Sequence, residues 1–439
     1  MALRYHIMTY GCQMNERDTE ILAGMLQDLG YVQTDSENDA DLVLLNTCCV
    51  RETAENKVWG KMGELKHLKT KNPDVILGIC GCMTQQPDIA DRIKEKVPHM
   101  DIVFGTHNIH VLPDLIGRVK EERGPIVEVW ASEGAIVENL PTARAEGVKA
   151  FVTIMYGCNN FCTYCIVPHV RGRERSRQVS DIVAEITRLA GEGYKEITLL
   201  GQNVNSYGKD LEPRVDFADL LVEVNKIEGV ERIRYTSSHP RDFTDKLIST
   251  IAQCDKVCEN VHLPVQAGSN GILQKMNRGY TREYYLDLVR KIKQTIPGVT
   301  ISTDLIVGFP GETEEDFLDT LDLLSQVQYQ AAYTFVYNKR SGTPAAEYDQ
   351  QVDEDTKKDR IQRLITFQND ISLAGNRQDE GKVVEILVEG PSKTNPQVLT
   401  GRTRTNRVVN FTGPDLLIGQ LVNVKITVAK TWNLEGVMV

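Results

Sequence analysis

Three closely spaced cysteines restrict the fold and chemistry of this chain more than any other part of its sequence. Cys158, Cys162 and Cys165 have CxxxCxxC spacing and directly follow an apolar run that predicts a strand at residues 151–155. Thiolate sulfur is the preferred ligand of iron–sulfur clusters, and three thiolates leave one iron of a four-iron cluster open. A zinc knuckle normally needs a fourth Cys or His, and a chance group of buried cysteines is the other alternative. The spacing therefore favours a [4Fe-4S] site on the loop after this strand.

This strand is the first of a series that predicts a barrel. Apolar runs alternate with mostly helical segments at residues 151–155, 196–200, 232–236, 260–263, 300–307 and 332–336. Six such βα units predict a partial (β/α)6 barrel over residues 149–375, with a last helix at 353–373. Polar segments containing Gly or Pro follow several of these strands, at the end where barrel active sites are built. Any one of these segments is also typical of an ordinary turn.

The N-terminal region, residues 1–118, alternates short strands with helices and predicts an α/β domain with a doubly wound parallel sheet. Cys12, Cys48 and Cys82 follow its first three strands. The carboxyl ends of parallel strands meet at one edge of a sheet, so we expect these thiols to lie close together. They predict a second iron–sulfur cluster, although each cysteine alone is typical of a small buried hydrophobe.

The other four cysteines are less informative. Cys49 and Cys80 compete with their neighbours for the ligand positions, whereas Cys254 and Cys258 are interpreted as core or surface thiols. Ten cysteines among 439 residues are too few for a disulfide scaffold. The chain has no run of the roughly 18 apolar residues that a membrane span needs, and its first residues do not resemble a signal peptide. We therefore expect a cytoplasmic protein without a membrane partner.

The C-terminal region differs in both pattern and charge. Residues 119–148 are predicted to be a linker with one strand candidate at 126–130, and residues 376–439 predict a small antiparallel β-barrel. The formal net charge is −11, yet Gly375 to Val439 carries eight Lys and Arg against six Asp and Glu. One predicted turn of this barrel holds three arginines that suit contact with an RNA backbone, or else form an ordinary exposed turn: Arg402, Arg404 and Arg407.

The cysteine triplet in its strand–loop context resembles the signature of radical S-adenosylmethionine (SAM) enzymes. Over essentially the whole chain the sequence resembles one family of them, the methylthiotransferases, through Asn46-Thr47-Cys48-Cys49-Val50-Arg51 and Gly81-Cys82-Met83-Thr84-Gln85. The resemblance implies that SAM binds the open iron of the first cluster and is cleaved to a radical. It also implies an auxiliary [4Fe-4S] cluster on Cys12, Cys48 and Cys82, from which sulfur reaches the substrate. The choice of Cys48 over Cys49, and of Cys82 over Cys80, comes from this resemblance.

The resemblance also implies roles outside the cysteines. The C-terminal barrel is similar to the RNA-binding TRAM module. If the substrate carries a prenyl group, as the similarity described below implies, that group would need an apolar pocket, for which Phe309, Tyr333 and Phe335 are candidates. An arginine run after the cluster loop suits phosphate and carboxylate contacts, although it is also typical of a solvated surface: Arg171, Arg173, Arg175 and Arg177. The residues expected to bind SAM on the barrel rim are Gln202, Asn203, Ser237, Gln266 and Asp304.

Within the family, the run from Cys158 to Arg177 is most similar to enzymes that modify isopentenyladenosine in tRNA. This similarity implies conversion of N6-isopentenyladenosine next to the anticodon to its 2-methylthio derivative, by sulfur insertion at C2 of adenine and methyl transfer from SAM. The implied partners are a tRNA anticodon stem-loop, a reducing electron donor such as flavodoxin, and a protein that supplies sulfur or clusters. Two alternatives stay open: a sister enzyme acting on threonylcarbamoyladenosine or a ribosomal-protein aspartate, and a non-catalytic iron–sulfur RNA-binding or redox-sensing protein.

Overall fold

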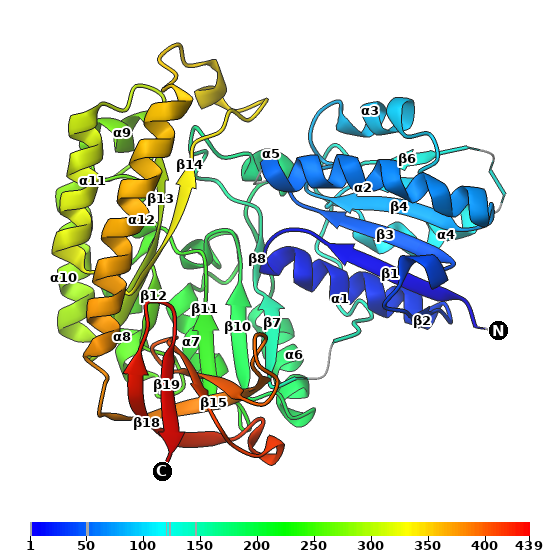
Figure 1. Cartoon of the computed structure of the whole chain (residues 1–439). Coiled ribbons are helices and arrows are strands. Elements are labelled where there is room, and N and C mark those ends of the chain that lie inside the picture. Colours follow the sequence, from blue (N-terminus) through cyan, green and yellow to red (C-terminus); the bar gives the residue numbers. More distant parts are fainter. Residues whose placement is uncertain (1, 50–51, 120, 123, 145–146) are drawn as a thin grey trace.

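The computed structural model describes residues 2–49, 52–119, 121–122, 124–144 and 147–439. Three domains follow one another along the chain. Figure 1 shows an N-terminal α/β domain beside a partial barrel, with a small closed β-barrel below the latter. The expected α/β class with a C-terminal β-barrel is confirmed.

The N-terminal domain is built on a parallel sheet with helices on both faces. Its described residues form six strands in the doubly wound order β2-β1-β3-β4-β5-β6. All residues of the two central strands, β3 and β4, are buried, which explains their continuous apolar sequence. The strands are β1 (Arg4–Thr9), β2 (Val32–Gln33), β3 (Leu42–Thr47), β4 (Ile76–Gly81), β5 (Ile102–Phe104) and β6 (Ile126–Glu128).

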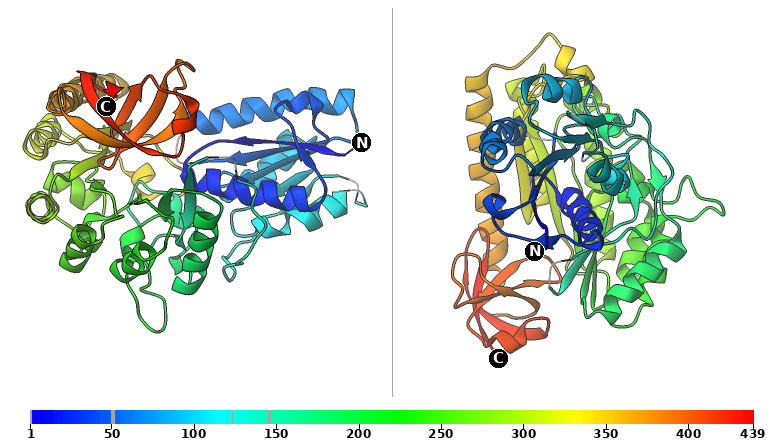
Figure 2. Two further views of the ribbon diagram at one scale, coloured as in Figure 1. Left: turned by 90° about the horizontal axis from the view of Figure 1, so that it is seen from below. Right: turned by 90° about the vertical axis from the view of Figure 1, so that its right-hand side faces the viewer.

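Two apolar clusters fix the helices to this sheet. One cluster joins the sheet to α1 (Gln13–Asp28) and α4 (Leu112–Val119), and the other joins the opposite face to α2 (Glu52–Lys71) and α3 (Ile89–Lys96). Figure 2 shows the sheet between these two helical layers. Short 3-10 turns occupy Glu37–Asp39 and Ile109–Val111.

The stretch expected to be a linker extends this sheet. Its strand candidate becomes β6, which pairs in parallel with β5 and buries Ile126. The N-terminal domain therefore continues past residue 118. A three-residue strand is too short to show the alternation that marks longer strands, so sequence periodicity could not identify it as part of the sheet.

The central domain is a partial barrel of parallel strands, in the chain order that its βα pattern predicted. Two hydrogen-bonded sheets, β7-β10-β11 and β12-β13-β14, meet where Ile233 forms an isolated bridge with Val257. The strands are β7 (Lys149–Thr153), β10 (Glu196–Leu200), β11 (Arg232–Tyr235), β12 (Asn260–His262), β13 (Thr300–Val307) and β14 (Ala331–Val336). A small ribbon of β8 (Met155–Tyr156) and β9 (Arg175–Ser176) flanks the loop that carries Cys158, Cys162 and Cys165.

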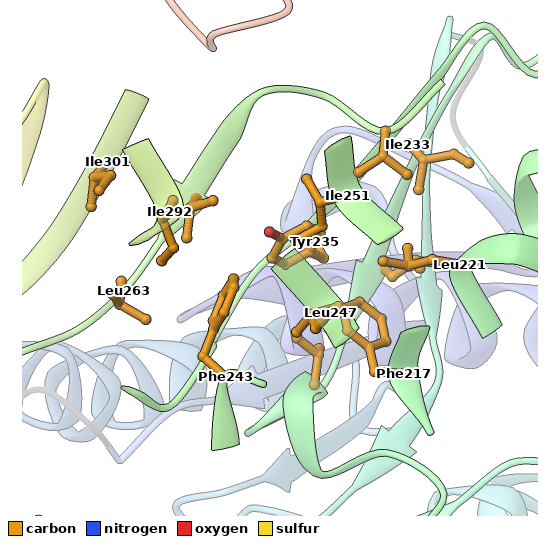
Figure 3. Packing of buried hydrophobic residues seen from close by; sticks show 14 of the residues in the cluster. Phe217, Leu221, Ile233, Tyr235, Phe243, Leu247, Ile251, Leu263, Ile292 and Ile301 are labelled. Carbon is orange, nitrogen blue, oxygen red and sulfur yellow. The ribbon is translucent and has the colours of Figure 1, made fainter. Parts of the chain in front are cut away.

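Helices cover the outside of this partial barrel, whereas the short α5 (Val167–Val170) lies between it and the N-terminal domain. The covering helices are α6 (Val179–Gly191), α7 (Phe217–Asn225), α8 (Asp245–Gln253), α9 (Asn270–Lys275), α10 (Arg282–Thr295), α11 (Glu314–Val327) and α12 (Glu354–Arg377). Short 3-10 turns lie at Val204–Ser206, Pro240–Asp242 and Pro344–Glu347. Figure 3 shows how Phe217, Leu221, Leu247 and Ile251 of α7 and α8 pack against Tyr235 of β11, which makes the strand ends rigid supports for a site.

The C-terminal domain is a closed barrel in the order β15-β16-β17-β19-β18. Its pairings are antiparallel as expected, except that β17 and β19 run parallel. The strands are β15 (Val383–Pro391), β16 (Leu399–Thr403), β17 (Val408–Phe411), β18 (Leu421–Ala429) and β19 (Leu434–Met438), with a 3-10 turn at Asp415–Leu417. Across the described ranges, no helix combines the length and the apolar character that crossing a membrane requires.

Candidate functional site

The first group of thiols lies on the loop between β8 and α5. Cys158 and Cys162 are buried, and the Cys165 amide donates to the Cys162 carbonyl at 2.9 Å. Gly157 begins the loop with φ +76°, and a Cβ there would lie 1.9 Å from the Arg173 carbonyl oxygen. Only glycine fits this position. Burial raises the pKa of Cys158 to about 11 and that of Cys165 to about 12, so without a metal these thiols stay protonated.

An arginine distant in sequence holds this loop from the opposite side of the barrel. Arg278 donates from Nη1 to the Cys162 sulfur at 3.2 Å and from Nη2 to the Pro264 carbonyl at 2.8 Å. Its side chain is buried and lies over the Tyr280 ring, 5.4 Å from the ring centroid. No local sequence pattern indicates this contact, since 116 residues separate Arg278 from Cys162.

Buried polar atoms without partners gather at the ends of β10 and β11. In the described part of the chain, no hydrogen bond reaches Gln202 Oε1, Asn203 Oδ1, the Asn205 amide, Ser238 Oγ or His239 Nε2. An unsatisfied buried polar group costs about 1–3 kcal/mol. These atoms therefore fit a polar ligand such as SAM, which carries an amino group, a carboxylate and hydroxyls. Two of the five expected SAM-binding residues, Gln202 and Asn203, are in this group, whereas Asn205, Ser238 and His239 were not singled out.

The His239 ring is neutral in this setting. Burial and then the Arg278 charge lower its pKa to about 2. Its Nδ1 accepts a hydrogen bond from the Arg241 amide at 3.3 Å, which leaves the proton on Nε2. The unpartnered Nε2 is therefore a neutral hydrogen-bond donor within the group of polar atoms.

Of the other three expected SAM-binding residues, Ser237 and Gln266 follow the ends of β11 and β12, and Asp304 lies within β13. Ser237 and Gln266 have φ of 65° and 77°, a backbone conformation that is unfavourable for residues other than glycine. The Gln266 amide donates to the Asp304 carbonyl at 2.9 Å, and the Asp304 carboxylate lies 3.5 Å from His262 Nε2. Four of the five expected positions thus follow the carboxyl ends of β10, β11 and β12, and Asp304 adjoins them through its hydrogen bond with Gln266.

A cavity of about 760 Å³ connects this rim with the C-terminal barrel. It is lined at one end by Cys165, Gln266 and Asp304, along β14 by Tyr333 and Phe335, and at the other end by Arg402 and Arg407. Tyr333 and Phe335 lie on the same face of β14, because side chains at positions i and i+2 of a strand point the same way. Both of these candidates for a prenyl pocket therefore line the cavity.

Phe309 does not line this cavity, contrary to the expectation for a prenyl pocket. It is fully buried in a separate apolar cluster, with its ring centroid 5.4 Å from that of Tyr337. The turn that begins at Gly308 directs this ring into the core behind β14.

The second group of thiols lies at the carboxyl edge of the N-terminal sheet. Cys48, Cys49 and Cys82 are buried, and Cys12 is exposed. A Cβ on Gly11 would lie 3.3 Å from the Cys48 sulfur, so the turns after β1 and β3 touch. A hydrogen bond from Cys49, together with the Arg171 charge, lowers the pKa of Cys82 to about 6 despite its burial. The predicted convergence of these turns is therefore observed.

The remaining cysteines lie apart from this edge. Cys80 belongs to the apolar cluster under α1 and α4. Cys254 and Cys258 are buried in the barrel domain, Cys254 within its main core. Cys49, by contrast, lies beside Cys82 and remains a competitor for the ligand position.

Arg171 reaches from the barrel domain into the second thiol group. Its Nε donates to the Cys82 sulfur at 3.2 Å, and its Nη2 lies 2.7 Å from the Asp18 carboxylate and 3.2 Å from Asn15 Oδ1. The side chain is only 6% exposed and that of Asp18 only 4%. The domain interface therefore holds a buried ion pair beside the thiols.

The rest of the arginine run is also engaged within the protein. Arg177 pairs with Glu185 at 2.7 Å, Arg175 donates to the Gly134 carbonyl, and the Arg173 guanidinium lies over the Phe161 ring. The Arg175 contact ties the barrel to the preceding segment. Arg171 and Arg177 are buried and Arg173 is exposed, so only part of the run is the solvated surface that such a sequence usually forms.

The two groups of thiols face each other across α5. Cys49 and Cys82 share an apolar cluster with Ile166 and Val170, and Ile166 directly follows Cys165. No three Cys, His, Asp or Glu side chains within the described ranges surround a single metal ion. A four-iron cluster spaces its thiolates by its own width, so the donor set suits clusters better than single ions.

The three C-terminal arginines each have an acidic partner. Arg402 lies 3.1 Å from Glu389, Arg404 lies 2.7 Å from Glu259, and Arg407 lies 3.2 Å from Asp379. Arg232 and Arg234 of β11 also donate to the backbone carbonyls of their turn. The turn of the C-terminal barrel that carries these arginines thus packs against β11 of the central domain. Its contact with RNA stays a prediction.

Comparison with known proteins assigns a family description to each domain. Residues 152–324 match the radical SAM superfamily, residues 4–105 match the uncharacterized protein family UPF0004, and residues 377–439 match the TRAM domain. The matches follow the three domains of the structure.

Curated relatives match the chain over nearly its full length. A tRNA-2-methylthio-N(6)-dimethylallyladenosine synthase from Desulforamulus reducens is 60% identical over 99% of this chain and 95% of its own. The protein of the same name from Carboxydothermus hydrogenoformans is 59% identical over 99% of both chains. The similarity therefore includes both groups of thiols and the C-terminal barrel.

Solved structures are similar in fold at low sequence identity. The radical SAM methyltransferase TsrM from Kitasatospora setae, with cobalamin and a [4Fe-4S] cluster bound, has a TM-score of 0.56 and 15% identity over 79% of this chain and 74% of its own. The cobalamin-dependent radical SAM enzyme OxsB has a TM-score of 0.54 and 14% identity over 82% of this chain and 56% of its own. These values support the architecture alone.

Proposed function

This chain belongs to the family of tRNA-2-methylthio-N(6)-dimethylallyladenosine synthases, and we propose from this premise how its residues divide the reaction. It is a radical SAM enzyme that methylthiolates the isopentenylated adenosine next to the anticodon of tRNA. It uses a [4Fe-4S] cluster and SAM, as its superfamily does. The ligands, the second cluster and the further partners are our proposals.

Cys158, Cys162 and Cys165 hold the cluster that binds SAM, and Cys12, Cys48 and Cys82 hold the auxiliary [4Fe-4S] cluster. The donor chemistry and the convergence of each group support both assignments. When bound, the first cluster with SAM supplies radical removal of hydrogen from carbon, and the second supplies sulfur. Radical chemistry suits C2 of adenine because this carbon has no leaving group.

The side chains around the thiols bind and orient the reacting groups. Arg278 fixes the Cys162 side chain, and the unpartnered atoms of Asn205, Ser238 and His239 are suited to bind the polar groups of SAM. Gln202, Asn203, Ser237, Gln266 and Asp304 complete the proposed SAM site along the rim.

The cavity beside this rim accepts the substrate base. Adenine must leave its stack to reach Cys165, which is easiest in a single-stranded loop. Tyr333 and Phe335 provide an apolar wall for the prenyl group. An anticodon stem-loop meets these requirements.

The reaction also needs electrons and sulfur from outside the chain. We therefore keep a reducing donor such as flavodoxin and a sulfur or cluster supply protein as proposed partners. Neither has a docking site assigned to it.

The observation that carries the proposal is the juxtaposition of the two thiol groups across α5. Anaerobic reconstitution with iron and sulfide tests it, with about eight irons expected for two four-iron clusters. Replacing Cys158, Cys162 and Cys165 by Ala should remove half of the iron and abolish SAM cleavage. The same change at Cys12, Cys48 and Cys82 should remove the other half and leave cleavage intact.

Cys254→Ala is the matched control, because this buried thiol lies in the barrel core and should not affect iron content. Full iron in the variant of Cys12, Cys48 and Cys82 would refute the auxiliary site. Substrate choice is tested with stem-loops that carry isopentenyladenosine, unmodified adenosine or threonylcarbamoyladenosine, using nucleoside mass as the readout. Preference for the threonylcarbamoyl loop would refute isopentenyladenosine as the substrate.

A further inference from the structure

An exposed tryptophan stands at the far end of the cavity that contains Cys165. Trp432 is 64% exposed and lines this cavity together with Tyr333 and Arg407. It lies on the tight turn between β18 and β19, which the Lys430 amide closes by donating to the Asn433 carbonyl at 2.9 Å. Ligand pockets are lined mostly by apolar and aromatic side chains, so an exposed aromatic ring on the wall of this cavity marks a candidate contact site.

Buried hydrogen bonds hold this turn in place. The Asn376 side-chain amide donates to the Lys430 carbonyl at 2.8 Å and to the Thr431 carbonyl at 3.1 Å. Asn376 is itself buried, and its oxygen accepts from Arg407 Nε at 3.1 Å. The backbone that presents Trp432 is therefore fixed before any ligand arrives, which lowers the entropy cost of binding there.

Charge contributes little to this end of the cavity. Arg407 is paired with Asp379 and Arg402 with Glu389, so each positive charge is compensated within the protein. Tyr333, which is 55% exposed, is a second aromatic ring along the cavity. The surface therefore offers aromatic faces rather than net positive charge, and it suits a nucleobase better than a phosphate.

We propose that Trp432 is a stacking site for an unpaired nucleobase of the tRNA loop that flanks the modified adenosine. This inference rests on the proposed function, in which the adenosine itself lies at the Cys165 end of the cavity. Neighbouring nucleotides of a loop are unstacked enough to bind aromatic side chains. Stacking tolerates any base because every base has a π face, so this site holds the loop without selecting its sequence.

The test is the affinity of the chain for an isopentenylated anticodon stem-loop, measured at several salt concentrations. Trp432→Ala should weaken binding about ten-fold or more, whereas Trp432→Phe should keep most of the affinity because it retains an aromatic face. The slope of log K against log salt should not change, since a lost phosphate contact would alter it by about one. Leu416→Ala is the matched control, because Leu416 is 71% exposed on the same barrel and does not line the cavity.

Stem-loops that lack one base at a time identify the stacked nucleotide. With one such abasic loop, parent and Trp432→Ala chains should bind equally, because the interacting base is gone. Equal binding of the intact loop by parent and Trp432→Ala chains would overturn the stacking site and leave the proposed function untouched. A ten-fold loss that persists with every abasic loop would overturn it too. No binding of the intact loop by the parent chain would overturn both proposals.

Discussion

Replacement of Arg171 by Met should destabilise the interface between the N-terminal domain and the barrel. The change removes the guanidinium that lies 2.7 Å from the Asp18 carboxylate, where both side chains are almost fully buried. Asp18 would then keep a buried charge without its partner. Breaking a buried pair in this way costs about 3–5 kcal/mol.

The assay is chemical denaturation of the metal-free chain, followed by fluorescence of Trp59 and Trp130 in a Trp432→Phe background. These two tryptophans report on the N-terminal region, so the relevant transition can be separated from that of the C-terminal barrel. Arg188→Met is the matched control, because Arg188 is 62% exposed and has only a 3.9 Å contact with Glu192. Its loss should cost less than about 1 kcal/mol.

A double variant separates the ion pair from simple packing. Arg171→Met combined with Asp18→Leu removes both charges of the ion pair, so it should recover most of the stability lost on breaking that pair. A loss below about 1 kcal/mol for Arg171→Met, or a double variant no more stable than the single one, would refute the reasoning.

Three further changes test other parts of the structure. Gly157→Ala should lower the bound iron by about half while the far-ultraviolet spectrum stays native, because a Cβ would lie 1.9 Å from a carbonyl oxygen; Gly191→Ala, which has open space, should have no effect on iron. Burial raises the pKa of Glu312 from 4.5 to about 7, so the folded chain binds this proton more tightly than the unfolded chain and the contribution of Glu312 to stability falls as the pH rises from 4.5 to 7. Glu312→Gln should flatten the dependence of the unfolding free energy on pH in this range. An unchanged dependence would contradict the shift. Arg404→Ala should destabilise the C-terminal barrel without changing the salt dependence of RNA binding, because the Arg404 charge is already paired with Glu259. A slope of log K against log salt lowered by about one would show instead that Arg404 contacts a phosphate.

The sequence predicted the site best where chemistry follows directly on a strand. Cys12, Cys48 and Cys82 each follow an apolar run, and parallel pairing of those runs was enough to bring their turns together. Arg278 and the Arg171–Asp18 pair could not be predicted, because their partners come from distant elements whose packing no local pattern encodes. The acidic partners of the C-terminal arginines were missed for the same reason. A basic turn looks identical in sequence whether it faces solvent or the base of a neighbouring domain.

Helix α12 sets a fixed distance inside this protein. Its 24 residues make it about 36 Å long. Near its start Arg360 binds Glu312 beside the barrel rim, and near its end Asn376 binds the turn that carries Trp432. Figure 1 shows it running along the barrel to the C-terminal domain. With RNA held at Trp432 as proposed, a base could reach the thiols only if it lay at a set spacing from the nucleotide stacked there.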